Sequence, residues 1–160
     1  MSEQTSTSTT PAITAKGKLD PRGPRFAAGI TVVVLAVVLI TASPIILALQ
    51  ALVFAAGAFL GPKNSPYGLL YAGLIRPRLQ PPRELEEEAP PRFAQTLGLA
   101  FAIVGLVAYL SGATVVGAVV IGLALVAAFL QAAFGFCLGC EIYLLARRVL
   151  HSSPSKEVSA

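Results

Sequence analysis

The sequence predicts an all-α membrane protein with four transmembrane helices arranged as two hairpins. Of its 160 residues, 55% are hydrophobic and only 12% are charged, about half the charged share of a typical soluble domain. Every Lys, Arg, Asp and Glu falls within residues 1–25, 63–92 or 141–160, and the two long blocks between these stretches are apolar. Apolar blocks of this length are typical of membrane spans.

Residues 1–19 are rich in Ser and Thr and show no apolar periodicity. Such a segment buries too little apolar surface to offset the entropy of ordering it, so we expect a disordered cytoplasmic tail. A signal peptide places its apolar core directly after a short basic stretch. Here about 25 polar residues come first, which predicts that the first helix is retained.

The first apolar block runs from Phe26 to Leu60. As one helix it would measure roughly 50 Å, whereas the hydrocarbon core of a bilayer is about 30 Å thick. Proline disfavours helix at the residue before it and lacks an N–H donor, so Thr41-Ala42-Ser43-Pro44 predicts a break. We expect spans over residues 24–41 and 45–60, the second of them short.

The second block, Phe93 to Cys140, divides similarly at Ser111-Gly112 and predicts spans over residues 92–110 and 113–136. The two hairpins resemble a diverged repeat. Pro24-Arg25-Phe26-Ala27 opens the first and Pro91-Arg92-Phe93-Ala94 the second, and Tyr67-Gly68-Leu69-Leu70 corresponds to Tyr143-Leu144-Leu145. Chance, and the common use of Pro-Arg at a membrane edge, explain the match equally well.

The connection over residues 61–91 contains an amphipathic stretch, Tyr67 to Ile75, and an acidic run at residues 84–88. We expect the amphipathic stretch to lie in the membrane interface, with Arg76, Arg78 and Arg83 near lipid headgroups. The acidic run is interpreted as a solvated linker, with docking of a basic partner as the alternative. Residues 20–150 then form the membrane domain, and residues 151–160 a second disordered cytoplasmic tail.

Four spans place both tails and the central connection on one side of the membrane. That side holds all 12 Lys and Arg, and the opposite loops, residues 41–44 and 111–113, hold none. Basic residues near span ends are retained in the cytoplasm. The charge pattern predicts a multi-pass plasma-membrane protein with both termini cytoplasmic.

The apolar blocks contain no Asp, Glu, Lys, Arg or His, which argues against an ion-coupled transporter or proton relay. Gln50 and Gln131 either form hydrogen bonds between helices or line a polar path. The small residues of the last two spans predict close helix packing. The net charge of +4 comes from residues that flank apolar segments, so nucleic acid is not indicated as a partner.

Both cysteines of the chain, Cys137 and Cys140, fall in one CxxC motif at the cytoplasmic end of the last span. Their spacing permits a disulfide or joint metal binding. Two thiolates fill only half of a tetrahedral metal site, and His151 is about 16 Å away along a helix, so we expect no metal and no cofactor. Cytosolic reductants keep such thiols reduced at rest, which favours a transient disulfide.

The neighbours of the cysteines disfavour thiolate. Phe134 and Phe136 desolvate the site, and Glu141 adds negative charge. We therefore expect the cysteines to receive exchange from an activated partner, unless Gly135 or Gly139 breaks the helix and exposes a new N-terminus. Glu141 is a candidate proton acceptor, with a solvated interfacial glutamate as the alternative.

Several motifs together resemble an uncharacterised actinobacterial membrane family, domain of unknown function number 4395. They are Asp20 to Phe26, Phe59 to Gly68, Pro91-Arg92-Phe93, and Phe134-Gly135-Phe136-Cys137-Leu138-Gly139-Cys140-Glu141-Ile142-Tyr143. The resemblance covers about residues 18–150. It implies an association with thioredoxin-like or rhodanese-like proteins of sulfur metabolism and supplies no catalytic residues.

The leading hypothesis is a membrane protein whose Cys137 and Cys140 exchange thiols, or relay sulfur, with a soluble partner of that kind. The chain is not expected to be an enzyme on its own. The alternatives are a non-catalytic scaffold with structural cysteines, and a passive permease for a small sulfur species. The lipid bilayer is the other expected partner, and homo-oligomers are compatible with the sequence.

Overall fold

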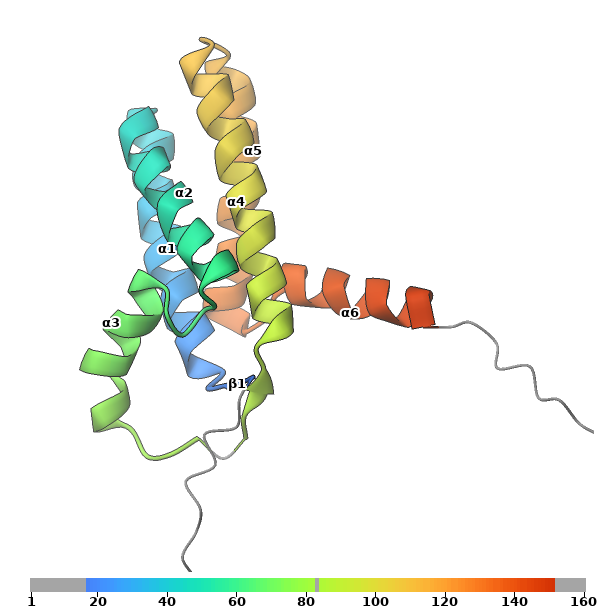
Figure 1. Cartoon of the computed structure of the whole chain (residues 1–160). Coiled ribbons are helices and arrows are strands. Elements are labelled where there is room, and N and C mark those ends of the chain that lie inside the picture. Colours follow the sequence, from blue (N-terminus) through green and yellow to red (C-terminus); the bar gives the residue numbers. More distant parts are fainter. Residues whose placement is uncertain (1–16, 83, 152–160) are drawn as a thin grey trace, which may run out of the picture.

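The computed structural model describes residues 17–82 and 84–151, and the chain there is mostly helical. Arg83 and most of both predicted tails lie outside the described residues. Four apolar helices run side by side as a bundle (Figure 1). They are α1 (Arg22–Thr41), α2 (Pro44–Phe59), α4 (Ala89–Leu110) and α5 (Thr114–Phe134).

The expected spans match these helices within three residues at every end. α1, α4 and α5 are long and apolar enough to cross a membrane, whereas α2, with 16 residues, is shorter. The outer surface of the bundle is apolar, with Ile40 84% and Val115 75% exposed. An apolar exterior of this extent is compatible with a membrane protein.

Local chemistry sets the break between α1 and α2. Ala42 adopts a left-handed conformation at φ 48° and ends α1. Ser43 then caps α2 by accepting a hydrogen bond from the Ile46 N–H at 3.5 Å, and Pro44 occupies the first helical position, where its missing N–H costs nothing. The predicted break at Ser43-Pro44 is therefore present.

The core lies where the two hairpins meet, because α1 packs chiefly on α5 and α2 chiefly on α4. Leu35, Leu47 and Ile121 are almost completely buried there. A Cβ added at Gly105 would lie 2.6 Å from Ile121 Cδ1, so this glycine permits the close approach of α4 and α5. Gly105 thus serves packing, as the sequence predicts, whereas Ala128, another small residue of the last two spans, lines a cavity.

The connection between the hairpins folds against the bundle. α3 (Pro66–Leu74) is followed by a short 3-10 helix, η1 (Arg76–Arg78). Two-residue strands, β1 (Lys18–Leu19) and β2 (Glu86–Glu87), pair antiparallel, with Lys18 opposite Glu87. Residues 18 and 19, expected at the end of the disordered tail, are therefore ordered, and Leu19 is only 7% exposed.

Ion pairs hold part of the acidic run within the chain. Glu88 lies 3.6 Å from Lys63, and Glu87 lies 3.7 Å from Arg147. Arg147 belongs to the last helix, α6 (Leu138–His151), which extends sideways from the bundle (Figure 1). The acidic run is thus more than a solvated linker, and α6 continues through residue 151, where the second tail was expected to begin.

Candidate functional site

The CxxC motif lies at the turn between α5 and α6. Gly135 adopts φ +71°, and its N–H donates to the carbonyl oxygens of Leu130 and Gln131, which ends α5. The chain restarts as α6 at Leu138, so Cys137 stands at the N-terminus of a 14-residue helix. The expected span end at residue 136 is therefore two residues too late, and the helix break at Gly135, which was the condition for activated thiols, is present.

Cys137 and Cys140 form a disulfide with their Cα atoms 5.1 Å apart. The Cys137 carbonyl accepts the first α6 hydrogen bond, from the Glu141 N–H at 3.0 Å. The Cys140 N–H points at the Cys137 sulfur, 3.2 Å away. The Cys137 sulfur thus occupies the place that a capping oxygen usually takes.

The N-terminus of α6 is held firmly against α4. A Cβ added at Gly139 would lie 2.7 Å from the Cα of Ala94, which is backbone and cannot move aside. One turn further, the rings of Tyr143 and Phe93 pack with their centroids 5.7 Å apart. These contacts fix the position of the disulfide relative to the bundle.

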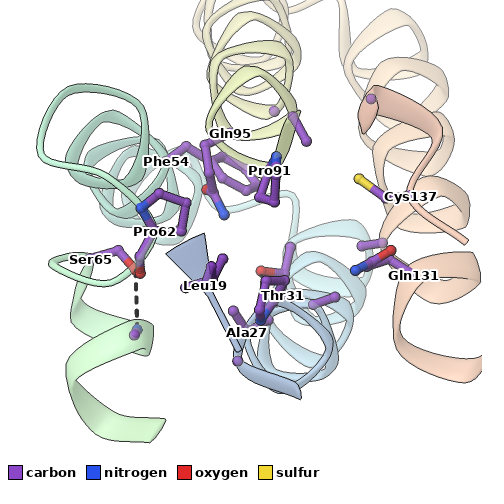
Figure 2. A pocket seen from close by; sticks show the side chains of 18 of the residues that line it. Leu19, Ala27, Thr31, Phe54, Pro62, Ser65, Pro91, Gln95, Gln131 and Cys137 are labelled. Carbon is purple, nitrogen blue, oxygen red and sulfur yellow. Dashed lines mark hydrogen bonds between the residues drawn. The ribbon is translucent and has the colours of Figure 1, made fainter. Parts of the chain in front are cut away.

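A cavity of about 470 Å³ opens beside Cys137 (Figure 2). Its walls come from the helices α1 to α5 and the start of α6, with β1 and the segments before and after α3 on the remaining side. Most of the lining is apolar, and the neutral polar side chains Thr31, Gln95 and Gln131 face it from α1, α4 and α5. Cys137 lines the cavity, whereas Cys140 does not.

The two glutamines of the sequence hypothesis have different environments. Gln50 is 1% exposed, accepts a hydrogen bond from the Tyr67 hydroxyl at 2.7 Å, and donates to Thr31 Oγ1 at 3.4 Å. Gln131 lines the cavity, and its Oε1 is buried with no hydrogen-bond partner among the described residues. Gln50 therefore ties helices together, whereas Gln131 lines the cavity with an unpaired amide oxygen.

Charged residues line the cavity only on the side of β1 and α3, at Lys18, Asp20, Lys63 and Arg76. Tyr71 joins this group by donating a hydrogen bond to Asp20 Oδ2 at 3.0 Å. Burial of Tyr71, together with the hydrogen bond and negative charge of Asp20, raises the pKa of its hydroxyl. The hydroxyl stays neutral and keeps α3 attached to the start of α1.

Glu141 lies on the exposed surface of α6. Among the described residues its carboxylate forms no hydrogen bond with either sulfur, so only its backbone contacts the motif. His151 lies at the opposite end of α6, far from the disulfide. Residues 17–82 and 84–151 contain no group of three or more His, Cys, Asp or Glu side chains placed to hold a metal.

A family comparison covers nearly all of this architecture, matching residues 19–148. The chain belongs to the family described as Domain of unknown function (DUF4395). The resemblance to DUF4395 noted in the sequence is confirmed, and the match carries no information about source organisms. No curated protein and no solved structure matches this DUF4395 chain.

Sequence reasoning located the cysteines of the DUF4395 chain but missed the cavity. The available signal was the presence of Gln95 and Gln131 in otherwise apolar helices, since an amide in such a helix needs a partner. Thr31 gave no comparable signal, because its hydroxyl donates to the Ala27 carbonyl of its own helix at 2.9 Å.

Proposed function

We propose that this protein exchanges thiols, or relays sulfane sulfur, with a soluble thioredoxin-like or rhodanese-like partner through Cys137 and Cys140. The observation that carries the proposal is the position of the CxxC. It starts a helix, it is closed as a disulfide, and one of its sulfurs lines a cavity. A purely structural disulfide needs neither the helix N-terminus nor the cavity.

The helix N-terminus assigns the attacking role to Cys137. Partial positive charge at the start of a helix stabilises a thiolate, and the Cys140 N–H already points at the Cys137 sulfur. The cysteines were expected to receive exchange unless Gly135 or Gly139 broke the helix, and the end of α5 at Gly135 meets that condition.

The exchange is balanced without any added oxidant. The Cys137 thiolate attacks a partner disulfide, a mixed disulfide forms and one partner thiolate leaves. Cys140 then attacks the Cys137 sulfur, which closes the disulfide and releases the reduced partner. With a persulfide donor, Cys137 accepts the outer sulfur and the donor leaves as a thiol, after which attack by Cys140 releases hydrogen sulfide.

The membrane arrangement is part of the proposal. α1, α2, α4 and α5 cross the bilayer, with the two termini and the CxxC on the cytoplasmic side. α2 measures about 24 Å against a core of about 30 Å, a mismatch that local thinning of the bilayer accommodates. The distribution of Lys and Arg supports this orientation.

α3 lies in the membrane interface in this arrangement. Leu69 and Leu74 are 59% and 56% exposed and are available to the acyl chains, while Arg76 and Arg78 directly after them are placed for headgroups.

The two halves of the chain, each with two spans and a following helix, are proposed to be diverged copies. Arg25 donates to the Ala133 carbonyl at the end of α5, and Arg92 donates to the Ala58 carbonyl at the end of α2. Each arginine of a Pro-Arg-Phe-Ala motif therefore caps the second helix of the other half. Two equivalent arginine–carbonyl contacts are harder to attribute to chance than the identity of a four-residue motif.

The helices that follow each hairpin support the same relationship. Phe26 packs on Tyr71 at 5.9 Å, as Phe93 packs on Tyr143 at 5.7 Å, and the ring planes meet at 44° and 45°. The sequence match aligns Tyr67 with Tyr143, whereas by these contacts Tyr71 is the equivalent of Tyr143. With this alignment, Cys137 corresponds to Ser65, whose Oγ caps α3 by accepting from the Gly68 N–H at 3.1 Å.

The test uses a rhodanese loaded with persulfide and a thioredoxin whose resolving cysteine is replaced by serine and whose remaining cysteine carries a thionitrobenzoate leaving group, each mixed with the reduced chain. The full chain in lipid nanodiscs is expected to form a mixed disulfide with the thioredoxin through Cys137, and Cys140→Ser is expected to trap it. Cys137→Ser and the double serine variant are expected to form none. Adducts are read by mass spectrometry of the intact proteins.

Labelling with a membrane-impermeant maleimide after mild reduction gives the second readout. Labelling in inverted vesicles and not in intact cells is expected. Two results together contradict the proposal and leave the scaffold hypothesis. The thiols react with neither the maleimide nor the partner proteins, and the wild type and the double serine variant give equal adduct yields.

A further inference from the structure

The cavity beside Cys137 has the chemistry of a small-molecule site. Its volume of about 470 Å³ lies within the usual range for ligand pockets, roughly 300–1,000 Å³. Away from the charged residues near β1 and α3, the walls are apolar and include the aromatic rings of Phe54 and Phe101. An anion placed among these walls would lose its hydration without gaining a cation, which disfavours charged sulfur species there.

Two amides in the cavity lack partners. The Oε1 atom of Gln131 is buried and unpaired, and within the described residues the Gln95 side chain forms no hydrogen bond. The two side chains enter the cavity from different helices, α4 and α5 (Figure 2). A buried acceptor without a donor, such as Gln131 Oε1, is costly. Because this oxygen accepts and the amide N–H groups of both glutamines donate, the cavity favours a ligand whose oxygens can both donate and accept hydrogen bonds, as hydroxyl and carbonyl groups do.

The position of the disulfide narrows the class of ligand further. Cys137 is the cysteine that lines the same cavity, so a molecule bound there meets the sulfur directly. A neutral, flat, lipid-soluble molecule with carbonyl oxygens satisfies the apolar walls and the amides together. Among such molecules, quinones also take two electrons from a dithiol.

We infer that this cavity binds the ring of a membrane quinone, which reoxidises the Cys137–Cys140 dithiol. The inference rests on the proposed function for its electron transfer, although the binding site itself does not require it. The amides of Gln95 and Gln131 donate hydrogen bonds to the ring carbonyl oxygens, and the apolar walls hold the ring faces.

The reaction balances in electrons and protons. Two S–H bonds break and the S–S bond forms, so the dithiol loses two electrons and two protons. The quinone gains both pairs, one proton on each carbonyl oxygen, and leaves as the hydroquinone. The dithiol forms when the exchange proposed above runs in reverse: a partner thiolate attacks the Cys137 sulfur, Cys140 leaves, and a second partner thiolate releases Cys137 as the partner disulfide forms. The protein would thus pass electrons from a reduced cytoplasmic partner to the lipid-soluble quinone pool.

Binding is tested apart from exchange by using the Cys137→Ser, Cys140→Ser double variant, which has no thiol chemistry. Decylubiquinone is expected to raise the thermal unfolding temperature of this variant in a concentration-dependent way, and decanol, which supplies only the chain, is expected not to. Ala128→Phe places a ring in the cavity and is expected to abolish the effect, because Ala128 lines it.

Gly122→Phe is the matched control on the same helix, since a Cβ added there meets no atom within 4 Å. It is expected to keep the full effect. Gln131→Leu and Gln95→Leu are expected to weaken quinone binding by about five- to tenfold each, the loss of one hydrogen bond. Their folding is checked by circular dichroism and gel filtration.

Electron transfer is read separately, as loss of quinone absorbance after the reduced wild-type protein is mixed with decylubiquinone without oxygen. Equal stabilisation by decanol and decylubiquinone, or unchanged binding in Ala128→Phe, overturns the site. Binding without quinone reduction keeps the site and rejects the electron transfer. Failure of the thioredoxin adduct with intact quinone binding rejects only the proposed partner exchange.

Discussion

Replacing Gln50 by leucine isolates the hydrogen bond that attaches α3 to α2. Gln50 is 1% exposed and accepts from the Tyr67 hydroxyl at 2.7 Å. Leucine is similar in volume and apolar, so Gln50→Leu removes the polar contact while filling the same space. The Tyr67 hydroxyl is then left without its partner, as is Thr31 Oγ1, to which Gln50 donates.

The loss of unfolding free energy expected for Gln50→Leu depends on which reference state applies. A buried group left unpaired in a soluble core costs about 1–3 kcal/mol. Interhelical hydrogen bonds measured in a membrane protein average about 0.6 kcal/mol and reach about 1.7. Tyr67 is half-buried at the end of the bundle, where water can reach a freed hydroxyl, so we expect a loss of about 1 kcal/mol.

A double-mutant cycle with Tyr67→Phe separates this bond from general packing. The free energy of unfolding is measured in mixed detergent micelles for both single variants and for the double variant. Because either substitution breaks the same bond, the double variant is expected to lose less than the sum of the singles, by about 1 kcal/mol.

Gln131→Leu provides the matched control for this cycle. It is the same change on another apolar helix, at a glutamine whose Oε1 has no partner among the described residues. Combined with Tyr67→Phe it is expected to be additive within about 0.5 kcal/mol. An additive result for Gln50→Leu as well would refute the interpretation of Gln50 as a tie between helices.

Three further outcomes are expected. In the reduced protein, Cys137 should be alkylated by iodoacetamide faster than Cys140 at neutral pH, as measured by peptide mass spectrometry, and equal rates would remove the role of the α6 N-terminus. Gly139→Val should destabilise the fold by about 1–3 kcal/mol through overpacking against α4. Gly73→Val, where a Cβ has open space within α3, should be neutral or stabilise by less than about 0.5 kcal/mol, because valine has a higher helix propensity than glycine. The raised pKa of Tyr71 contributes stability that is complete below about pH 10 and is lost as the pH rises further. Above about pH 10, the thermal unfolding temperature of Tyr71→Phe should therefore fall less steeply with pH than that of the wild type.

Composition and charge were sufficient to predict the bundle helices. Their ends coincide with features visible in the sequence, such as Ser43-Pro44 and Gly112, because caps and turns depend on local residues. The CxxC motif itself was also evident from the sequence. Its place in the fold was not, since the apolar run continues through Phe134, Phe136 and Leu138, and hydrophobicity alone does not mark the break at Gly135.

The cavity was beyond sequence reasoning for a different reason. Helices that are apolar on every side carry no periodicity to show which face meets a neighbour and which meets lipid or open space. Gln50 and Gln131 look alike in the sequence, although one is paired and the other is not. The capping roles of Arg25 and Arg92 were likewise hidden, because their partners are distant in sequence and are backbone carbonyls.

The crossed packing of the two hairpins has a consequence for biogenesis. The principal neighbour of α1 is α5, and that of α2 is α4, so the first hairpin leaves the ribosome before either of its main partners exists. It must wait without these partners until translation of the second hairpin is complete. Truncation after α4 would therefore leave α1 without its partner, and quality-control proteases are expected to remove such a product sooner than the full chain.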